Sequence, residues 1–66
     1  MDTVTIAASN ELAEMKLNDL IGREGSVVKA LYCKDGHTIR GAWVELLGEP
    51  YMNEKEWYIP RESIVW

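Results

Sequence analysis

The carboxyl-terminal segment, residues 56–66, constrains the fold of this chain more than any other part of the sequence. Its Trp-Tyr-Ile run at 57–59 consists of aromatic and β-branched side chains, which fit the pleated, half-buried surface of a strand. Because proline cannot donate a ladder hydrogen bond, the strand must end or bend at Pro60. Residues 61–63 leave room for one tight turn before residues 64–66 become extended again. The segment therefore predicts a strand, a turn and a second strand.

The middle of the chain predicts a β-hairpin followed by a loop. Residues 26–32 form an apolar-rich run that is typical of a strand, and Asp35-Gly36 is a dipeptide strongly favoured in hairpin turns. The return strand is expected over residues 38–46, with Gly41 marking a bulge or a tight bend. Residues 47–55 contain glycine, proline and asparagine, which predict the loop that leads to the last two strands.

Residues 1–16 carry two different local signals. Apolar and polar side chains alternate over residues 3–6, as they do in an edge strand. Ser9 then precedes a stretch in which Leu12 and Met15 are three residues apart, a pattern typical of a helix start with Ser9 as its N-cap. The sequence leaves a tail, an edge strand and a short helix open for this segment.

Two motifs in the chain resemble those of the SH3-like barrels. Residues 57–65 are similar to the strand, proline and 3₁₀ turn that precede the final strand of these folds, and GREGSVV at 22–28 is similar to the Gly-x-x-Gly-x-Val opening of their KOW-type members. The resemblance covers residues 17–66 and implies an all-β fold, a small five-stranded SH3-like barrel, with residues 1–16 as a loosely attached N-terminal segment. Ser63 stands where peptide-binding SH3 domains carry a tyrosine, so the usual groove for proline-rich peptides is not expected.

Composition narrows the classes of partner and compartment. The chain has 66 residues, enough for one small domain, and its three Trp and three Tyr suit a small core rich in aromatic side chains. The net charge of −4 disfavours nucleic acid as a partner, although residues 23–40 carry a local excess of cations. Cys33 is the only cysteine, which excludes an intramolecular disulfide. Without a signal peptide or an apolar run of about 20 residues, a cytoplasmic location without membrane contact is expected.

Side chains with catalytic or metal-binding chemistry are few and scattered. Cys33 and His37 flank the predicted turn, with Asp35 between them. An exposed hairpin tip offers a nucleophile no oxyanion donors, and a metal site needs three or four ligands. The carboxylates of the second half are interpreted as solubilising surface charge: Glu45, Glu49, Glu54, Glu56 and Glu62. Since the glycines at 22 and 25 also lack a P-loop ending, no enzymatic activity, cofactor or metal is predicted.

The aromatic residues provide the strongest functional signal. In the return strand the aliphatic side chains at 42, 44 and 46 share one face, which places Trp43 on the other, and Tyr58 has the same relation to its neighbours. Because exposed Trp and Tyr are enriched at interface hot spots, we predict a non-catalytic protein-interaction module or small accessory subunit that binds another protein or itself. Its contact residues are Trp43, Tyr58 and Tyr51, with Arg40 and Arg61 at the rim. A strand covered on both faces would instead place Trp43 in the core, and the sequence leaves this open.

A second hypothesis is RNA or ribosome association through the hairpin. Residues 23–40 would contact phosphates through their four cations, Arg23, Lys29, Lys34 and Arg40. This interpretation agrees with the KOW-type resemblance and predicts an affinity that falls steeply with salt, because bound phosphates release their counterions.

Overall fold

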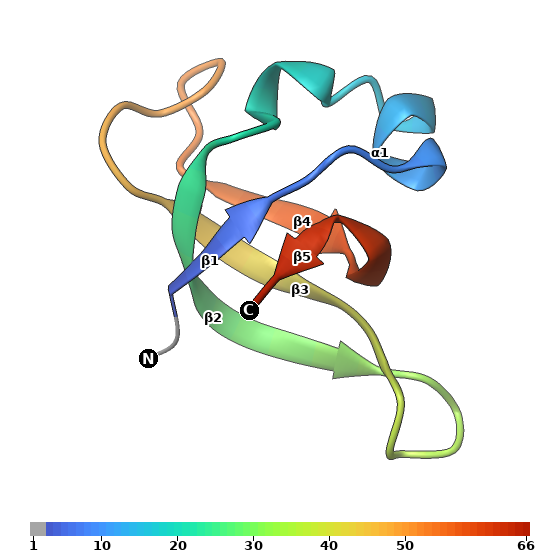
Figure 1. Cartoon of the computed structure of the whole chain (residues 1–66). Helices are drawn as coiled ribbons and strands as arrows, with labels where there is room; N and C mark the ends of the chain where they lie inside the picture. Colours follow the sequence, from blue (N-terminus) through green and yellow to red (C-terminus); the bar gives the residue numbers. More distant parts are fainter. Residues whose placement is uncertain (1–2) are drawn as a thin grey trace.

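The computed structural model describes residues 3–66, which form one antiparallel sheet of five strands (Figure 1). The strands are β1 (Thr3–Ile6), β2 (Glu24–Tyr32), β3 (Ile39–Leu46), β4 (Glu56–Pro60) and β5 (Ile64–Val65). The helical elements are the short helix α1 (Asn10–Glu14) and two 3₁₀ turns, η1 (Asn18–Leu20) and η2 (Arg61–Ser63). The predicted all-β class is confirmed, as are the hairpin of β2 and β3 and the terminal strand, turn and strand.

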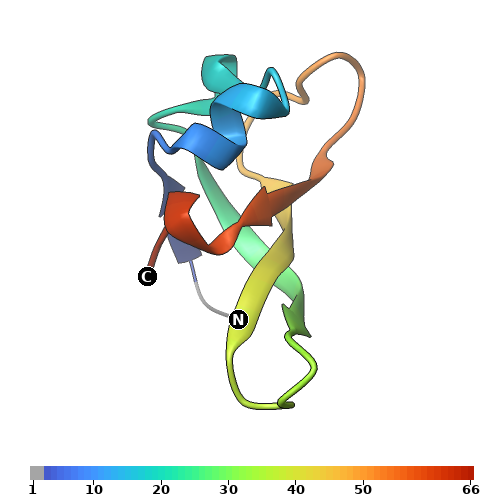
Figure 2. The ribbon, with the colours of Figure 1, turned by 90° about the vertical axis from the view of Figure 1, so that its right-hand side faces the viewer.

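The sheet is curled but open. Its strand order is β4-β3-β2-β1-β5, so the two outer strands follow each other in the chain with only η2 between them. Figure 2 shows β4 passing through η2 into β5, which bends the chain back toward β1. Within residues 3–66, no strand pairing joins β4 to β5. The expected closed barrel is therefore not confirmed.

Residues 1–16 are joined to the sheet more closely than the sequence analysis expects. β1 lies between β2 and β5, with Thr3 opposite Ser26 and Thr5 opposite Val65. After β1 the segment continues into α1, so it contains both a strand and a short helix. Met1 and Asp2 lie outside the described residues. The expected loose attachment is therefore not found. β1 pairs with both β2 and β5, and among the described residues it is the only strand that pairs with β5.

The start of α1 is fastened to η2 by side-chain and backbone hydrogen bonds. The Oγ atom of Ser9 caps the helix by accepting from the backbone N–H of Leu12 at 3.1 Å. The same hydroxyl lies 2.6 Å from the Oγ atom of Ser63, which is fully buried. The backbone N–H of Ala7 donates to the carbonyl oxygen of Ser63 at 2.7 Å. The predicted N-cap at Ser9 is confirmed, and it also joins two segments far apart in the sequence.

The core lies on the inner face of the curled sheet, under α1 and η1. Its buried apolar residues come from β1, β3, β4, β5 and the segment between β1 and β2: Val4, Ile6, Leu12, Leu17, Leu20, Ala42, Val44, Leu46, Ile59 and Ile64. β2 adds the partly buried Val27. Burial of each larger aliphatic side chain contributes roughly 1.5–3 kcal/mol. Since three of these residues precede Met15, the N-terminal segment is part of the core and not an appendage to it.

Gly41 is required by a close approach between β3 and β4. Leu31 pairs with Gly41 and Tyr32 with Ile39, so β3 carries one extra residue, Arg40, at this point. A Cβ atom on Gly41 would overlap the ring of Tyr58 and lie 2.7 Å from the carbonyl oxygen of Ile59. The predicted bulge next to Gly41 is confirmed, and the missing side chain makes room for Tyr58.

Candidate interaction surface

Trp43 lies on the outside of the sheet. Its neighbours Ala42 and Val44 are fully buried on the inner face, whereas Trp43 keeps 39% of its surface exposed. The strand register places Trp43 opposite Tyr58 on β4 and opposite Lys29 on β2. The alternative left open by the sequence, that Trp43 belongs to the core, is therefore wrong.

Trp43 and Tyr58 form an aromatic pair held in one geometry. Their ring centroids lie 6.1 Å apart with an interplanar angle of 69°, the edge-to-face arrangement that aromatic quadrupoles favour. The hydroxyl of Tyr58 donates to the carbonyl oxygen of Arg40 at 3.3 Å, which directs the ring across Gly41. Because the two side chains already hold one arrangement, binding of a partner would fix few additional side-chain torsions and cost little conformational entropy.

Two carboxylates adjoin this pair on the same face. Glu45 and Glu56 are directly opposite each other in the register of β3 and β4, one row of outward side chains beyond Trp43 and Tyr58. Both glutamates are exposed. We call the surface formed by Lys29, Trp43, Glu45, Glu56 and Tyr58 the outer aromatic face. From the sequence, Glu45 and Glu56 are interpreted as solubilising surface charge, because their pairing appears only once the register of β3 and β4 is known.

Tyr51 belongs to a different part of the molecule. Its ring packs against Trp57 at a centroid distance of 5.5 Å, and Trp57 points to the inner face of β4, away from Tyr58. The Tyr51 hydroxyl donates to Oδ2 of Asp19 at 3.0 Å, and this hydrogen bond raises the pKa of Tyr51. Trp57 donates its Nε1–H to the carbonyl oxygen of Glu54 at 2.9 Å. Tyr51 therefore fastens the loop before β4 to η1 and is not brought to Trp43.

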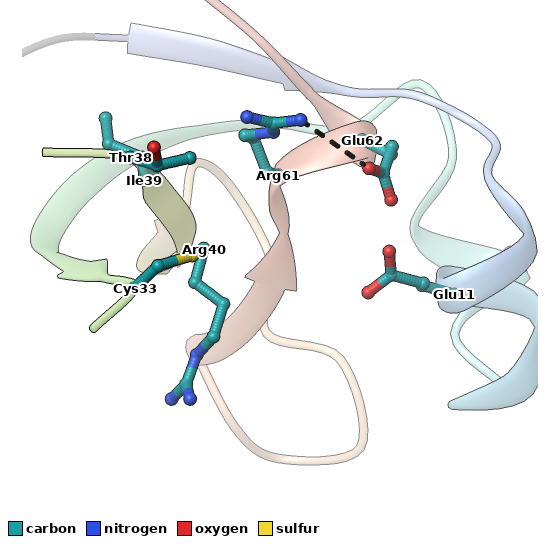
Figure 3. A pocket seen from close by; sticks show the side chains of 7 residues that line it. All are labelled: Glu11, Cys33, Thr38, Ile39, Arg40, Arg61 and Glu62. Atoms are coloured by element: carbon teal, nitrogen blue, oxygen red, sulfur yellow. Dashed lines mark ion pairs between the residues drawn. The ribbon is translucent and has the colours of Figure 1, made fainter. Parts of the chain in front are cut away.

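The two predicted rim arginines, Arg40 and Arg61, line an open depression of about 200 Å³ between the hairpin, α1 and η2 (Figure 3). The guanidinium of Arg40 points away from the acidic side of the depression. Arg61 lies 4.0 Å from Glu62, at the limit of an ion pair. Glu11 faces Glu62, and a shared hydrogen bond together with the like charge of Glu62 raises the pKa of Glu11.

The hairpin tip is organised by Asp35. Its carboxylate accepts from the backbone N–H groups of His37 at 2.8 Å and Thr38 at 2.9 Å, and from the Thr38 hydroxyl at 2.7 Å. These hydrogen bonds lower the pKa of Asp35. Cys33 is half-buried beside the depression, and His37 is exposed. In residues 3–66, no three His, Cys, Asp or Glu side chains are grouped so that they could hold a metal ion.

The four cations of the nucleic-acid hypothesis do not share one surface. Arg23 donates from its guanidinium to the carbonyl oxygen of Leu47 at 3.1 Å and to that of Glu49, so it fastens the loop after β3. Lys34 lies beyond the opposite end of β2, in the hairpin turn. Lys29 faces outward beside Trp43, and Arg40 lines the depression. The sequence could not indicate the engagement of Arg23, since the acceptors are backbone atoms of a distant loop.

Comparisons with known proteins return no relative for this chain. No protein-family model matches it, no curated protein matches it, and no solved structure matches it. No helix among the described residues is long and apolar enough to cross a membrane.

Proposed function

We propose that this chain is a non-catalytic protein-interaction module of the SH3-like type, and that its contact surface is the outer aromatic face. The observation that carries the proposal is the exposure of Trp43 on β3, an inner strand of the sheet, where it packs edge-to-face against Tyr58. Trp and Tyr dominate interface hot spots because a rigid ring removes much apolar area from water and loses few torsions on binding.

The size of the molecule supports a surface of this kind. A stable interface buries about 800 Å² on each partner, and the whole accessible surface of this protein is 4453 Å². A partner of ordinary size would therefore cover somewhat under a fifth of the molecule's surface. Trp43 lies on β3 between β2 and β4, so a partner on the outward face of these strands would cover Trp43, and binding energy usually concentrates in such covered positions.

The depression near Glu11 gives little support to a catalytic alternative. It is open to solvent, and both Glu11 and Glu62 are exposed. Acid–base catalysis by two carboxylates depends on environments that separate their pKa values, which an enclosed pocket provides and an open surface does not. A binding role for the chain needs neither an enclosed pocket nor carboxylates with separated pKa values.

The proposal is tested by capturing partners from the native host with tagged protein, with and without nuclease, and identifying them by mass spectrometry. We expect a partner that survives nuclease and is lost with Trp43→Ala. Trp66→Ala is the matched control, because Trp66 is also exposed but follows β5, at the opposite edge of the sheet. Circular dichroism and amide NMR spectra of each variant check that it is folded.

Two results would overturn the proposal. If folded Trp43→Ala retains every partner, the outer aromatic face is not the contact surface. If capture disappears after nuclease treatment, the partner is a nucleic acid and the hairpin hypothesis replaces this one. Partners include a second copy of the chain, which light scattering after size-exclusion chromatography detects.

A further inference from the structure

The register of β3 and β4 forces Glu45 and Glu56 close together. The backbone N–H of Leu46 donates to the carbonyl oxygen of Lys55 at 2.7 Å, which makes the next pair along, Glu45 and Glu56, a non-hydrogen-bonded pair. Side chains approach most closely at such pairs, with Cα atoms about 4.5 Å apart. Like charges directly opposite destabilise a sheet. The fold therefore places two acidic side chains in one cross-strand pair of the outer aromatic face.

Within residues 3–66, no cation forms an ion pair with Glu45 or Glu56. The one ion pair within 4.0 Å in residues 3–66 joins Arg61 to Glu62, away from the outer aromatic face. Lys29 is on that face, but the register sets it opposite Trp43 in the neighbouring row. The face consequently combines two carboxylates that have no ion-pair partner with two aromatic rings, and both attract a cation brought by a partner.

The same charges argue against two other occupants. A phosphate backbone would be repelled by Glu45 and Glu56, so this face does not suit a nucleic acid. A second copy of the chain whose Glu45–Glu56 row lay over the same row in a twofold dimer would bring four carboxylates together. Charge complementarity to Glu45 and Glu56 favours a protein segment that carries positive charge.

On the basis of the proposed function, we propose that the partner presents an extended segment in which a Lys or Arg lies two residues from an apolar side chain. Successive outward rows of a sheet are about 7 Å apart, and side chains at i and i+2 of an extended segment have the same spacing. The apolar side chain packs on Trp43 and Tyr58, and the cation lies between Glu45 and Glu56. The spacing of the face thus selects both the charge of the partner and the position of that charge.

The first experiment titrates the protein with the peptide acetyl-SLTRS-amide and follows its amide and indole NMR signals. We expect shifts at the Trp43 indole and at the amides of Glu45 and Glu56, and weaker binding as salt is added. The matched peptide acetyl-SLTES-amide should bind at least tenfold more weakly. Equal binding of the two peptides, or no binding of either at millimolar concentration, overturns the inference.

The second experiment compares two charge-neutralising variants with the same change in net charge. The face variant Glu45→Gln/Glu56→Gln should bind the basic peptide, and the captured partner, roughly tenfold more weakly, as expected for the loss of two exposed charge pairs. The loop variant Glu49→Gln/Glu54→Gln should bind within about twofold of the wild type, because both glutamates lie outside the face. The face variant should also have a Tm about 1–3 °C higher, since a repulsive pair is removed.

Failure of this inference is distinguishable from failure of the proposed function. If the face variant keeps its partner while Trp43→Ala loses it, the outer aromatic face binds but the partner is not basic, and only the further inference falls. If both variants keep the partner, both proposals fall. A face variant that binds weakly and is no more stable than the wild type shows that the carboxylates are not held in repulsion, which overturns the argument from their register.

Discussion

Two pairs of glutamates meet in this protein, and they meet for different reasons. Glu11 and Glu62 come together because α1 docks on η2, where the Ser9 and Ser63 hydroxyls are in contact. Glu45 and Glu56 come together through strand register alone, next to an aromatic pair that has no role in the core. The first pair belongs to a junction that the fold needs, and the second to a surface that the fold can do without. Substitutions at the junction should change stability, and substitutions on the outer aromatic face should change binding.

Leu12→Ala should have the largest effect, because Leu12 is fully buried and anchors the junction in the core. A Leu→Ala change in a core costs about 2–5 kcal/mol, which is comparable with the whole free energy of unfolding of a domain this small. Urea denaturation measures the loss. Met15→Ala on the same segment is the control, since Met15 is exposed and should change the free energy of unfolding by less than about 0.5 kcal/mol. A Leu12→Ala protein as stable as the wild type would show that the N-terminal segment is not part of the core.

Gly41→Ala tests the close contact between Gly41 and the Tyr58 ring, which belongs to the outer aromatic face. The new methyl group would collide with the Tyr58 ring, and overpacking of this kind costs about 1–3 kcal/mol. The cost should shrink in a Tyr58→Ser background, which a double-mutant cycle measures. Additive effects of the two substitutions would mean that Tyr58 does not lie over Gly41. This substitution should lower both stability and partner binding, because it moves an aromatic ring of the outer aromatic face.

Ser9→Ala removes the helix cap and leaves the buried Ser63 hydroxyl without its partner. Loss of such a cap costs about 1 kcal/mol. Partner binding should be unchanged while the free energy of unfolding falls, which separates the junction from the face. Ser26→Ala is the comparison, since Ser26 is opposite Glu45 on the outward side of β2 and has no cap to lose. Equal effects of the two substitutions would contradict the role assigned to Ser9.

The pH dependence of stability should be opposite at Glu11 and Asp35. The pKa of Glu11 is raised from its ordinary value of 4.5, so the folded protein binds that proton more tightly and gains stability as the pH falls from 7 toward 4.5. The pKa of Asp35 is lowered from 3.8, so its contribution is present above pH 3.8 and disappears as the pH falls through the folded-state value.

Urea midpoints measured across this pH range for Glu11→Gln and Asp35→Asn check both signs, and both effects should be small because the groups are exposed. Glu11→Gln should reduce the increase in stability between pH 7 and 4.5. Asp35→Asn should reduce the decrease in stability at lower pH. If Glu11→Gln leaves the upper range unchanged, Glu11 and Glu62 do not interact in solution.

Local chemistry explains which features the sequence predicts and which it does not. The Asp35-Gly36 turn, the break at Pro60 and the cap at Ser9 are set by a few adjacent residues, and each is found where it is expected. The outward position of Trp43 follows from alternation once β3 is recognised. The place of β1 depends on pairing with residues distant in the chain, as does the engagement of Arg23 by the Leu47 carbonyl. The Glu45–Glu56 pair depends on the register across the loop between β3 and β4, which no local pattern specifies.

The position of β1 between β2 and β5 also has a consequence for how fast the protein folds. The hairpin of β2 and β3 joins residues close in the chain, so it can form on the microsecond scale of isolated hairpins. Pairing of Thr5 with Val65 instead closes a loop of about 60 residues. This closure lowers the chain's entropy before the contacts between β1 and β5 can stabilise the folded state. Sheets built from such distant pairings fold in milliseconds to seconds. Stopped-flow refolding should therefore place this protein among slow folders for its size, with the union of β1 and β5 as its last step.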